Sequence, residues 1–306
     1  MVEQPARSKV DAPRIKGSEM GPAPKKRRRA KPTPIVAPPV RIGLALGGGF
    51  ARGIAHIGVM KVLEEEHIPL HCIAGVSAGS IVAAAWASGR PAAEIAAVAS
   101  HMRLYDFAFF SLCRLGLMHT ERMNAFLHKL LKVYRFEEMQ VPLGIVATDL
   151  KSGEAMLFCK HGDVTTPIRA SCSFPGLFQP VAFQGQLLTD GAIAMEVPAA
   201  AARHMGANHV LSISLPYEDL TEPTNVAGVV NRCFQILQLR TEDSWRKHSD
   251  LVVTPPVDHV AWNGFEHASQ LVAAGEAAAR AALPQLREWL GTTAMPPAVD
   301  GLSIAS

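Results

Sequence analysis

Short apolar runs alternate with alanine-rich or amphipathic segments along most of the chain. The runs have the length of β-strands and lie at residues 40–46, 72–76, 142–149, 155–159, 181–183, 186–189, 209–214 and 250–254. The segments between them have helical spacing or composition and lie at residues 54–66, 78–87, 91–102, 120–131, 198–205, 226–245 and 266–290, with a further short helix that ends at residue 173. Strands that alternate with helices form a mainly parallel sheet covered by helices. The pattern therefore predicts an α/β domain over residues 41–290.

The two ends of the chain differ from this domain in composition. Residues 1–40 are rich in proline and carry a net charge of +7, against +3 for the whole chain, which leaves about −4 on the rest. A segment with so few apolar clusters cannot offset the entropy cost of becoming ordered. We therefore expect a disordered basic tail at residues 1–40 and a flexible C-terminal tail at residues 291–306.

The basic residues of the N-terminal tail include a cluster formed by Lys25, Lys26, Arg27, Arg28, Arg29 and Lys31. Such a cluster attracts anionic lipid, at about 1 kcal/mol per residue near the surface. It also suits nucleic acid or a nuclear import signal, and a solvated tail without a specific partner is the remaining alternative. The sequence does not choose among these alternatives.

The whole-chain composition limits the classes of protein that need to be considered. Hydrophobic residues make up 48% of the 306 residues, enough for a large core. The longest uninterrupted apolar run, residues 81–87, is far shorter than the roughly 18 residues of a membrane-spanning helix. The N-terminus lacks the apolar core of a secretory signal, and the five cysteines include no C-x-x-C pair, so neither a disulfide framework nor a zinc site is indicated. We expect a cytoplasmic protein whose membrane contact, if any, is peripheral.

The most informative motif is Gly-Val-Ser-Ala-Gly at residues 75–79. It follows a predicted strand and precedes a predicted helix, the context in which G-x-S-x-G places a serine on a sharp turn with its hydroxyl exposed. Gly75 and Gly79 are needed because the turn brings the residues on either side of Ser77 almost into contact. The motif also arises by chance in chains rich in glycine and alanine. Ser77 is therefore a candidate nucleophile that needs support from other motifs.

A glycine loop, Gly47-Gly48-Gly49-Phe50-Ala51-Arg52-Gly53, follows the first predicted strand. As a phosphate-binding P-loop it lacks the lysine, because Ile54 occupies that position. As a dinucleotide fingerprint it lacks the third glycine, because Arg52 occupies that position. An oxyanion hole, in which backbone N–H groups of consecutive glycines stabilise a developing negative charge, is the function that also uses Ser77. A tight turn packed against a helix is the alternative without chemistry.

Asp190 is the carboxylate best placed to act as a base for Ser77. It ends a predicted strand and precedes Gly191, so the edge of the sheet can hold it in a fixed position. Asp149 also ends a predicted strand, but an aspartate that opens a turn is commonly a local backbone acceptor. The alternative bases are four histidines that lie in no motif requiring one, and for which we expect surface or core positions: His56, His161, His204 and His209.

Together the three motifs, at residues 47–53, 75–79 and 190–192, resemble those of the patatin-like phospholipases. The likeness is greatest to the bacterial single-domain members and to the esterase domain of neuropathy target esterase, and it extends over about residues 41–290. It implies a three-layer α/β/α fold with a mainly parallel central sheet, and a catalytic dyad of Ser77 as nucleophile and Asp190 as base. It implies no cofactor and no metal. The remaining residues that the resemblance assigns are the oxyanion hole, Gly47, Gly48, Gly49 and Arg52, and the positions that support the motifs, Gly75, Gly79, Gly191 and Ala192.

The resemblance implies a serine acyl-ester hydrolase that acts on lipid, of phospholipase or lysophospholipase type. The chain departs from the family at residues 195–198, Met-Glu-Val-Pro, where many members carry a segment rich in Asn and Pro. Two other functions stay open. An acyltransferase would use the same dyad, and a non-catalytic regulator or adaptor would keep the fold as a binding module.

One aromatic-rich stretch, residues 105–118, has no motif of its own. Ordinary core packing is the usual role of such a stretch. The alternatives are a mobile lid and the wall of a groove for an acyl chain.

Overall fold

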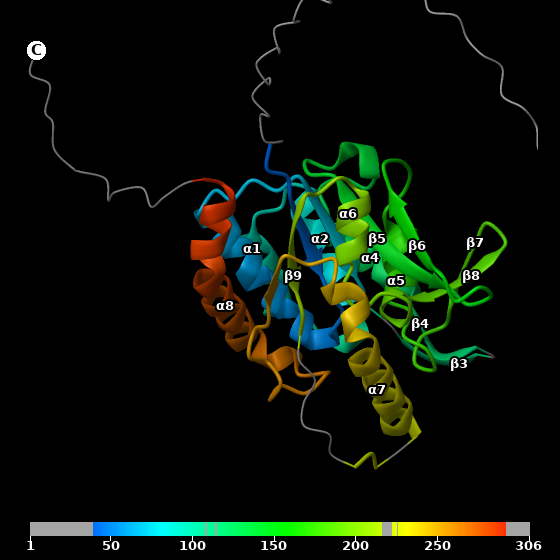
Figure 1. The fold of residues 1–306 in the computed structure, drawn as a ribbon. Helices are drawn as coiled ribbons and strands as arrows, with labels where there is room; N and C mark the ends of the chain where they lie inside the picture. The colour runs from blue at the N-terminus through cyan, green and yellow to red at the C-terminus, as the bar shows by residue number, and fades with distance from the viewer. Residues whose placement is uncertain (1–38, 108, 114, 216–221, 225, 292–306) are drawn as a thin grey trace, which may run out of the picture. The chain divides into compact units, whose positions relative to one another are not determined.

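The computed structural model describes residues 39–107, 109–113, 115–215, 222–224 and 226–291 (Figure 1). All of them belong to the unit Pro39–Ser306, one of two units into which the chain divides. The tails predicted at residues 1–40 and 291–306, including the basic cluster, lie outside the described residues except for positions 39, 40 and 291.

Ten described strands form one large sheet and one small hairpin. The strands of the large sheet are β1 (Ile42–Leu46), β2 (Cys72–Val76), β5 (Leu143–Asp149), β6 (Ala155–Cys159), β7 (Val181–Phe183), β8 (Gln186–Asp190), β9 (His209–Ile213) and β10 (Leu251–Val253). They lie in the order β10-β9-β1-β2-β5-β8-β7, and β6 pairs with β5. Strands β10, β9, β1, β2 and β5 are parallel, whereas β6, β7 and β8 pair antiparallel with their neighbours. The hairpin consists of β3 (Phe109–Cys113) and β4 (Gly116–His119).

Helices cover both faces of the large sheet, because its central strands are apolar on both sides. Ile42, Leu44 and Leu46 of β1 are buried in the core shared with α1, α2, α3 and α8, whereas Ala45 lies in the core shared with α6 and Trp245 of α7. The described helices are α1 (Ala55–Glu65), α2 (Ala78–Ala87), α3 (Ala92–Ala99), α4 (Glu121–Leu130), α5 (Thr165–Ser171), α6 (Ala199–His204), α7 (Val226–Arg246) and α8 (Ala268–Trp289). This arrangement confirms the predicted three-layer α/β/α fold with a mainly parallel central sheet.

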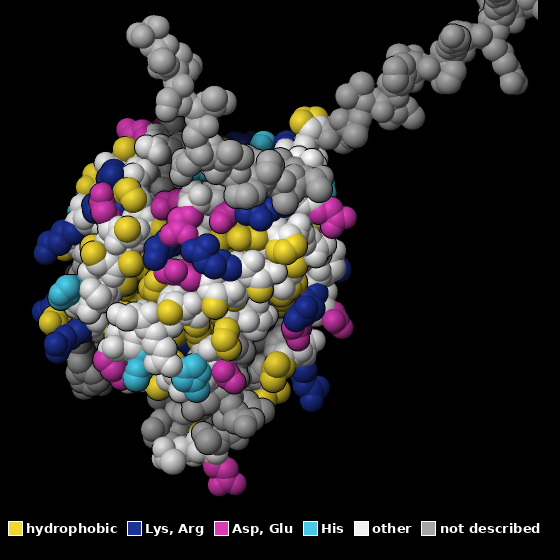
Figure 2. Space-filling model, turned by 90° about the vertical axis from the view of Figure 1, so that its left-hand side faces the viewer, with side chains coloured by type: hydrophobic (Ala, Val, Ile, Leu, Met, Phe, Trp, Pro, Cys, Tyr) yellow, Lys and Arg dark blue, Asp and Glu magenta, His cyan; other side chains and the backbone are white. Residues whose placement is uncertain are grey.

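Helices α1 and α8 lie side by side on one flank of the sheet (Figure 1). Glycines allow this close approach, because a Cβ atom at Gly58 would lie 2.0 Å from the carbonyl oxygen of Val272 and one at Gly275 would lie 1.9 Å from that of Ala55. Lys and Arg side chains lie beside Asp and Glu side chains over this flank (Figure 2). They form the ion pairs Lys61–Glu276, Arg280–Glu65 and Arg287–Glu66. The flank is therefore a charged, solvated surface.

The register of β5 determines where the candidate site forms. Val146 pairs with Val76 at the end of β2, and the next residue, Ala147, pairs with Asp190 at the end of β8. Both pairs lie on the side of β5 away from β6, because β6 pairs with the same two residues on the other side. On this side of β5, β2 pairs with the first part of the strand and β8 pairs with the part that follows. This places Asp190 beside Ser77, although the two are 113 residues apart in sequence.

No helix among the described residues is both long and apolar enough to cross a membrane. Cys72, Cys159, Cys172 and Cys233 carry free thiols.

Candidate active site

Ser77 lies on a sharp turn between β2 and α2 with φ 51° and ψ −126°. A positive φ at a serine is strained, at a cost of the order of 1–3 kcal/mol. Two hydrogen bonds hold the turn: the Ser77 N–H donates to Ser171 Oγ (2.8 Å), and Ser80 Oγ donates to the Ser77 carbonyl (2.6 Å). The backbone therefore fixes Ser77, the candidate nucleophile, in the strained geometry that the motif predicts.

The two glycines of the motif are required by close contacts on either side of the turn. A Cβ atom at Gly75 would lie 2.5 Å from Ser80 Cα, and one at Gly79 would lie 2.4 Å from the carbonyl oxygen of Leu46. These distances are far shorter than van der Waals contact distances. The atoms on the other side of each contact belong to the backbone and cannot move freely. The predicted supporting role of both glycines follows from this crowding.

Asp190 accepts a hydrogen bond from Ser77. Ser77 Oγ lies 2.8 Å from Asp190 Oδ2, and the Ala192 N–H donates to the other carboxylate oxygen, Oδ1, at 2.9 Å. Thr148 Oγ1 donates to the Asp190 carbonyl (2.8 Å), and Gly191 packs so closely that a Cβ atom there would lie 2.1 Å from the carbonyl oxygen of Val146. The carboxylate is thus held from several sides in position to accept the serine proton.

The Asp190 side chain lies almost entirely out of contact with solvent, with the residue 2% exposed. Burial raises the pKa of this carboxyl to about 7, and the hydrogen bonds from Ala192 and Ser77 oppose the shift. A base with a pKa near neutrality can both accept and return a proton at physiological pH.

The glycine loop passes directly in front of the serine. A Cβ atom at Gly48 would lie 3.5 Å from Ser77 Cβ and 3.6 Å from Ala192 Cβ. The Gly47 N–H donates to the Ile213 carbonyl (3.1 Å), and the Gly48 N–H makes a long contact with the Glu196 carbonyl (3.4 Å). Gly47 therefore anchors the loop to the sheet, whereas Gly48 lies beside Ser77.

Arg52 lies in the short 3-10 helix Phe50–Ile54 that follows the loop and is 4% exposed. Its backbone N–H donates to the Gly49 carbonyl at 3.1 Å, which closes the turn at the end of the loop. A part for Arg52 in an oxyanion hole stays a prediction.

His56 holds the glycine loop through a hydrogen bond to the backbone of Gly47, a role that the sequence analysis missed. Its Nε2 lies 2.9 Å from the Gly47 carbonyl oxygen, which can only accept, so Nε2 carries the proton. Burial lowers the pKa of His56 to about 4, and the hydrogen bond to Gly47 only partly opposes this, so the ring is neutral. The sequence contained one indication of this role, because His56 follows the loop on an otherwise apolar first turn of α1.

The other candidates for catalytic chemistry lie elsewhere. His161 and His204 are exposed, and His209 is half-buried at the start of β9. Asp149 accepts hydrogen bonds from the Lys151 N–H (3.2 Å) and from Ser152 Oγ (2.9 Å). Its role as a local acceptor in the turn after β5 is confirmed.

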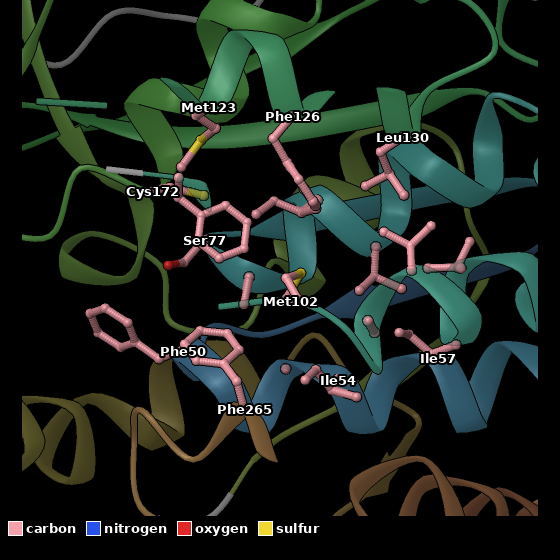
Figure 3. Close-up of a pocket in the computed structure, with 18 of the residues that line it drawn as sticks. Phe50, Ile54, Ile57, Ser77, Met102, Met123, Phe126, Leu130, Cys172 and Phe265 are labelled. Atoms are coloured by element: carbon pink, nitrogen blue, oxygen red, sulfur yellow. The ribbon is translucent and has the colours of Figure 1, made fainter. Parts of the chain in front are cut away.

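An apolar pocket containing about 730 Å³ of empty space, including the solvent at its mouth, extends from Ser77. Ser77 and Phe50 lie at one end of it in Figure 3, and Leu130 and Ile57 lie at the other. None of the described residues that line it is charged, and Ser77 supplies the only hydroxyl. Phe107, from the aromatic-rich stretch, is one of these residues, so that stretch contributes to a pocket wall. An apolar lining of this kind suits an apolar group attached to a reactive centre at Ser77.

A sequence model of the patatin-like phospholipases matches residues 44–203, which contain the glycine loop, Ser77 and Asp190. The chain belongs to the patatin-like phospholipase family. An uncharacterised NTE family protein of Mycobacterium tuberculosis is 32% identical over 200 residues, which cover 63% of this chain and 55% of that protein. The human patatin-like phospholipase domain-containing protein 6 is 32% identical over 192 residues, covering 59% of this chain and 14% of that protein.

This patatin-like protein is also similar to a fungal relative and to a solved bacterial structure. A lysophospholipase of Mycosarcoma maydis is 27% identical over 228 residues, which cover 72% of this chain and 12% of that protein. The structure of VipD from Legionella pneumophila matches 81% of this chain and 67% of that chain, with a TM-score of 0.55 and 13% identity. The likeness to VipD concerns the fold alone. The match spans little more than half the length of the mycobacterial relative, and 14% and 12% of the human and Mycosarcoma maydis proteins.

Proposed function

We propose that this patatin-like protein is a serine carboxylic ester hydrolase of lipids, with Ser77 as nucleophile and Asp190 as base. The observation that carries the proposal is the 2.8 Å hydrogen bond from Ser77 Oγ to a buried carboxylate at the end of an apolar pocket. A serine hydroxyl is a weak nucleophile unless a neighbouring base accepts its proton. Asp190 is such a base, and the strained turn keeps the hydroxyl in its reach.

The reaction follows from this geometry in two steps. Asp190 accepts the proton of Ser77 Oγ as that oxygen attacks the ester carbonyl, and the N–H groups of Gly48 and Gly49 stabilise the resulting oxyanion. The Gly48 N–H is available because its 3.4 Å contact with the Glu196 carbonyl is long and weak. Asp190 then returns the proton to the leaving alkoxide, which leaves an acyl group on Ser77. Water, activated by Asp190 in the same way, releases the acid.

The pocket supports a lipid with a single long acyl chain at the cleaved bond as substrate. An uncharged lining places no polar group along the chain, and burial of each methylene contributes about 0.8 kcal/mol. Lysophospholipids fit this description, and one relative of this chain is named a lysophospholipase. We therefore propose lysophospholipid as the substrate class.

A fluorescent fluorophosphonate tests the proposed dyad, because it reacts with activated serines. Wild-type protein should be labelled, and peptide mass spectrometry should locate the adduct on Ser77. Ser77→Ala should abolish labelling, and Asp190→Asn should slow it at least about a hundredfold, the usual contribution of a general base. Ser100→Ala, at an exposed serine after α3, is the matched control and should label like the wild type. An adduct on another serine, or unchanged labelling of Asp190→Asn, would contradict the dyad.

A further inference from the structure

Helix α7 carries apolar side chains on the side that faces solvent. Val226, Val229, Ile236 and Leu237 are 81%, 49%, 41% and 56% exposed. At about 100° per residue these positions fall on one side of the helix, so they form a continuous stripe over three turns. Another side faces the protein, where Phe234 packs edge-on against Phe174 with ring centroids 5.1 Å apart and Trp245 is 2% exposed. Exposed apolar stripes of this length mark an interaction surface rather than ordinary protein surface.

The stripe is continuous with a groove that leads to the apolar pocket at Ser77. Leu117 of β4, Val226 of α7 and Trp262 all line this groove, and all three are exposed. Phe50 lines both the groove and the pocket that contains Ser77. Its ring contacts that of Trp262, with the centroids 5.1 Å apart. In Figure 1, α7 and the β3–β4 hairpin project on the same side of the sheet. The exposed apolar residues therefore surround the approach to the nucleophile.

The charges on the first part of α7, residues 226–241, suit an anionic lipid surface. Residues 226–241 contain two arginines, Arg232 and Arg240, and no acidic residue, and the first acid of the helix is Glu242. An apolar stripe with arginines and without carboxylates is typical of helices that lie in the interface of an anionic bilayer. The flank formed by α1 and α8 carries acids and bases together and offers no comparable surface (Figure 2).

We propose that Leu117, Val226, Val229, Ile236, Leu237 and Trp262 form a docking face that inserts into the surface of a lipid bilayer. The apolar side chains enter the level of the lipid head groups, where tryptophan is favoured. The groove then opens into the bilayer, so that a lipid reaches Ser77 without crossing water. The proposal rests on the proposed function for its purpose, but binding to the bilayer is a separate property that can be measured alone.

The test is flotation of the full chain with vesicles of phosphatidylcholine and phosphatidylglycerol, at low salt and at about 0.5 M NaCl. High salt reduces the screening length to roughly 4 Å and so suppresses attraction through the basic tail. Ile236→Gln/Leu237→Gln removes apolar area while keeping the charge and a good helix former at both positions. The affinity for vesicles should fall at least about tenfold at both salt concentrations.

Val40→Gln is the matched control. Val40 is also an exposed apolar residue, but it precedes β1 at the end of the sheet opposite to Ser77, so vesicle binding should not change. Hydrolysis of a soluble short-chain ester should be equal in the wild type and both variants.

Two results would overturn the docking face. One is unchanged vesicle binding by the double variant at both salt concentrations. The other is a wild-type dimer in size-exclusion chromatography with light scattering that the double variant dissociates, with no vesicle binding by either protein, because a second copy would then cover this face. If no ester is hydrolysed and Ser77 is not labelled, but only the double variant loses vesicle binding, the proposed function fails and the docking face stands.

Discussion

Burial gives the two titratable residues around the nucleophile opposite shifts. It raises the pKa of Asp190 from 3.8 to about 7 and lowers that of His56 from 6.5 to about 4, because removal from water disfavours the charged form of each. Folding therefore becomes less favourable through Asp190, and more favourable through His56, as the pH rises across the range between their folded and ordinary values. The two contributions to the free energy of unfolding oppose each other, so this pair adds little net pH dependence below about pH 6.5.

The pH dependence of activity should not cancel in this way, because only the protonation of Asp190 affects the proposed proton transfer. Only the ionised carboxylate accepts the serine proton, so kcat/KM for a soluble ester should rise with pH and reach half its maximum near the folded pKa of about 7. Below that pH it should fall about tenfold per unit. A pH–rate profile at constant ionic strength measures this. An inflection near pH 4 would show that the carboxyl keeps its ordinary pKa, and an acidic limb that is unchanged in Asp190→Asn would show that Asp190 does not act as the base.

His56 should position the glycine loop rather than take part in proton transfer. His56→Leu leaves the buried Gly47 carbonyl without its donor, which should lower the free energy of unfolding by about 1–3 kcal/mol and reduce kcat more than it raises KM. Urea unfolding and steady-state kinetics test both effects. His56→Gln can place an amide N–H near the position of Nε2 and should restore much of the activity, with the inflection near pH 7 unchanged. Equal loss in both variants would argue against the hydrogen bond as the cause.

Among the elements, the glycine loop and the serine turn use their glycines for different reasons. A methyl group at Gly48 would make only ordinary contacts, at 3.5 Å from Ser77 Cβ, but it would fill the space in front of the nucleophile. A methyl group at Gly75 would lie 2.5 Å from Ser80 Cα and push the turn apart. Gly48→Ala should therefore fold with nearly wild-type stability and lose most of its activity, whereas Gly75→Ala should be destabilised by more than about 3 kcal/mol.

Thermal unfolding and fluorophosphonate labelling of the two glycine variants distinguish these effects. If Gly48→Ala kept full activity, the loop would not face the reacting carbonyl.

Most strands and helices of the domain could be predicted closely from the sequence, because their apolar runs or helical spacing are clear and glycine or proline bounds several of them. The hairpin β3–β4 could not, although its strands are close in sequence, because its aromatic residues follow no strand alternation. Phe107 of that stretch is buried in the pocket, whereas Leu115 and Leu117 are exposed, so the stretch is neither wholly core nor wholly lid. The helix expected over residues 120–131 is α4, which begins at Glu121, and the side chain of the preceding Thr120 makes no capping hydrogen bond.

Ser77 and Asp190 could be named from the sequence, but their contact could not be derived from it. That contact depends on β8 pairing with the part of β5 that follows the part paired with β2, a matter of strand register over a long separation. The hydrogen bond from His56 to Gly47 was missed for a similar reason, because a single histidine in an apolar helix has no motif that marks a donor.

At the scale of the whole molecule, we propose that two parts of the chain bind a membrane in different ways. The basic tail, which lies outside the described residues, would act through charge, and the proposed docking face would act through apolar contact. Removing residues 1–38 should weaken binding to anionic vesicles at low salt by at least about tenfold and have little effect at about 0.5 M NaCl. Residues 39 and 40 are kept because the Pro39 carbonyl accepts a hydrogen bond from Asn208 Nδ2.

Flotation of the truncated protein measures this effect, with turnover of a soluble ester as the control for folding. Equal binding at low salt would show that the tail is not a tether to lipid.

The position of β8, one strand from the end of the sheet, also makes the proposed catalytic pair sensitive to local unfolding. Only β7 lies beyond β8 at this end of the described sheet order, and three residue pairs join β8 to β5. Strands near the edge of a sheet exchange with solvent through local openings that cost less free energy than global unfolding. An opening of β7 and β8 together would carry Asp190 away from Ser77 while the central parallel strands stay intact. On gradual denaturation, catalysis should therefore disappear before the secondary structure does, and the amide protons of β8 should exchange with deuterium earlier than those of β1 and β2.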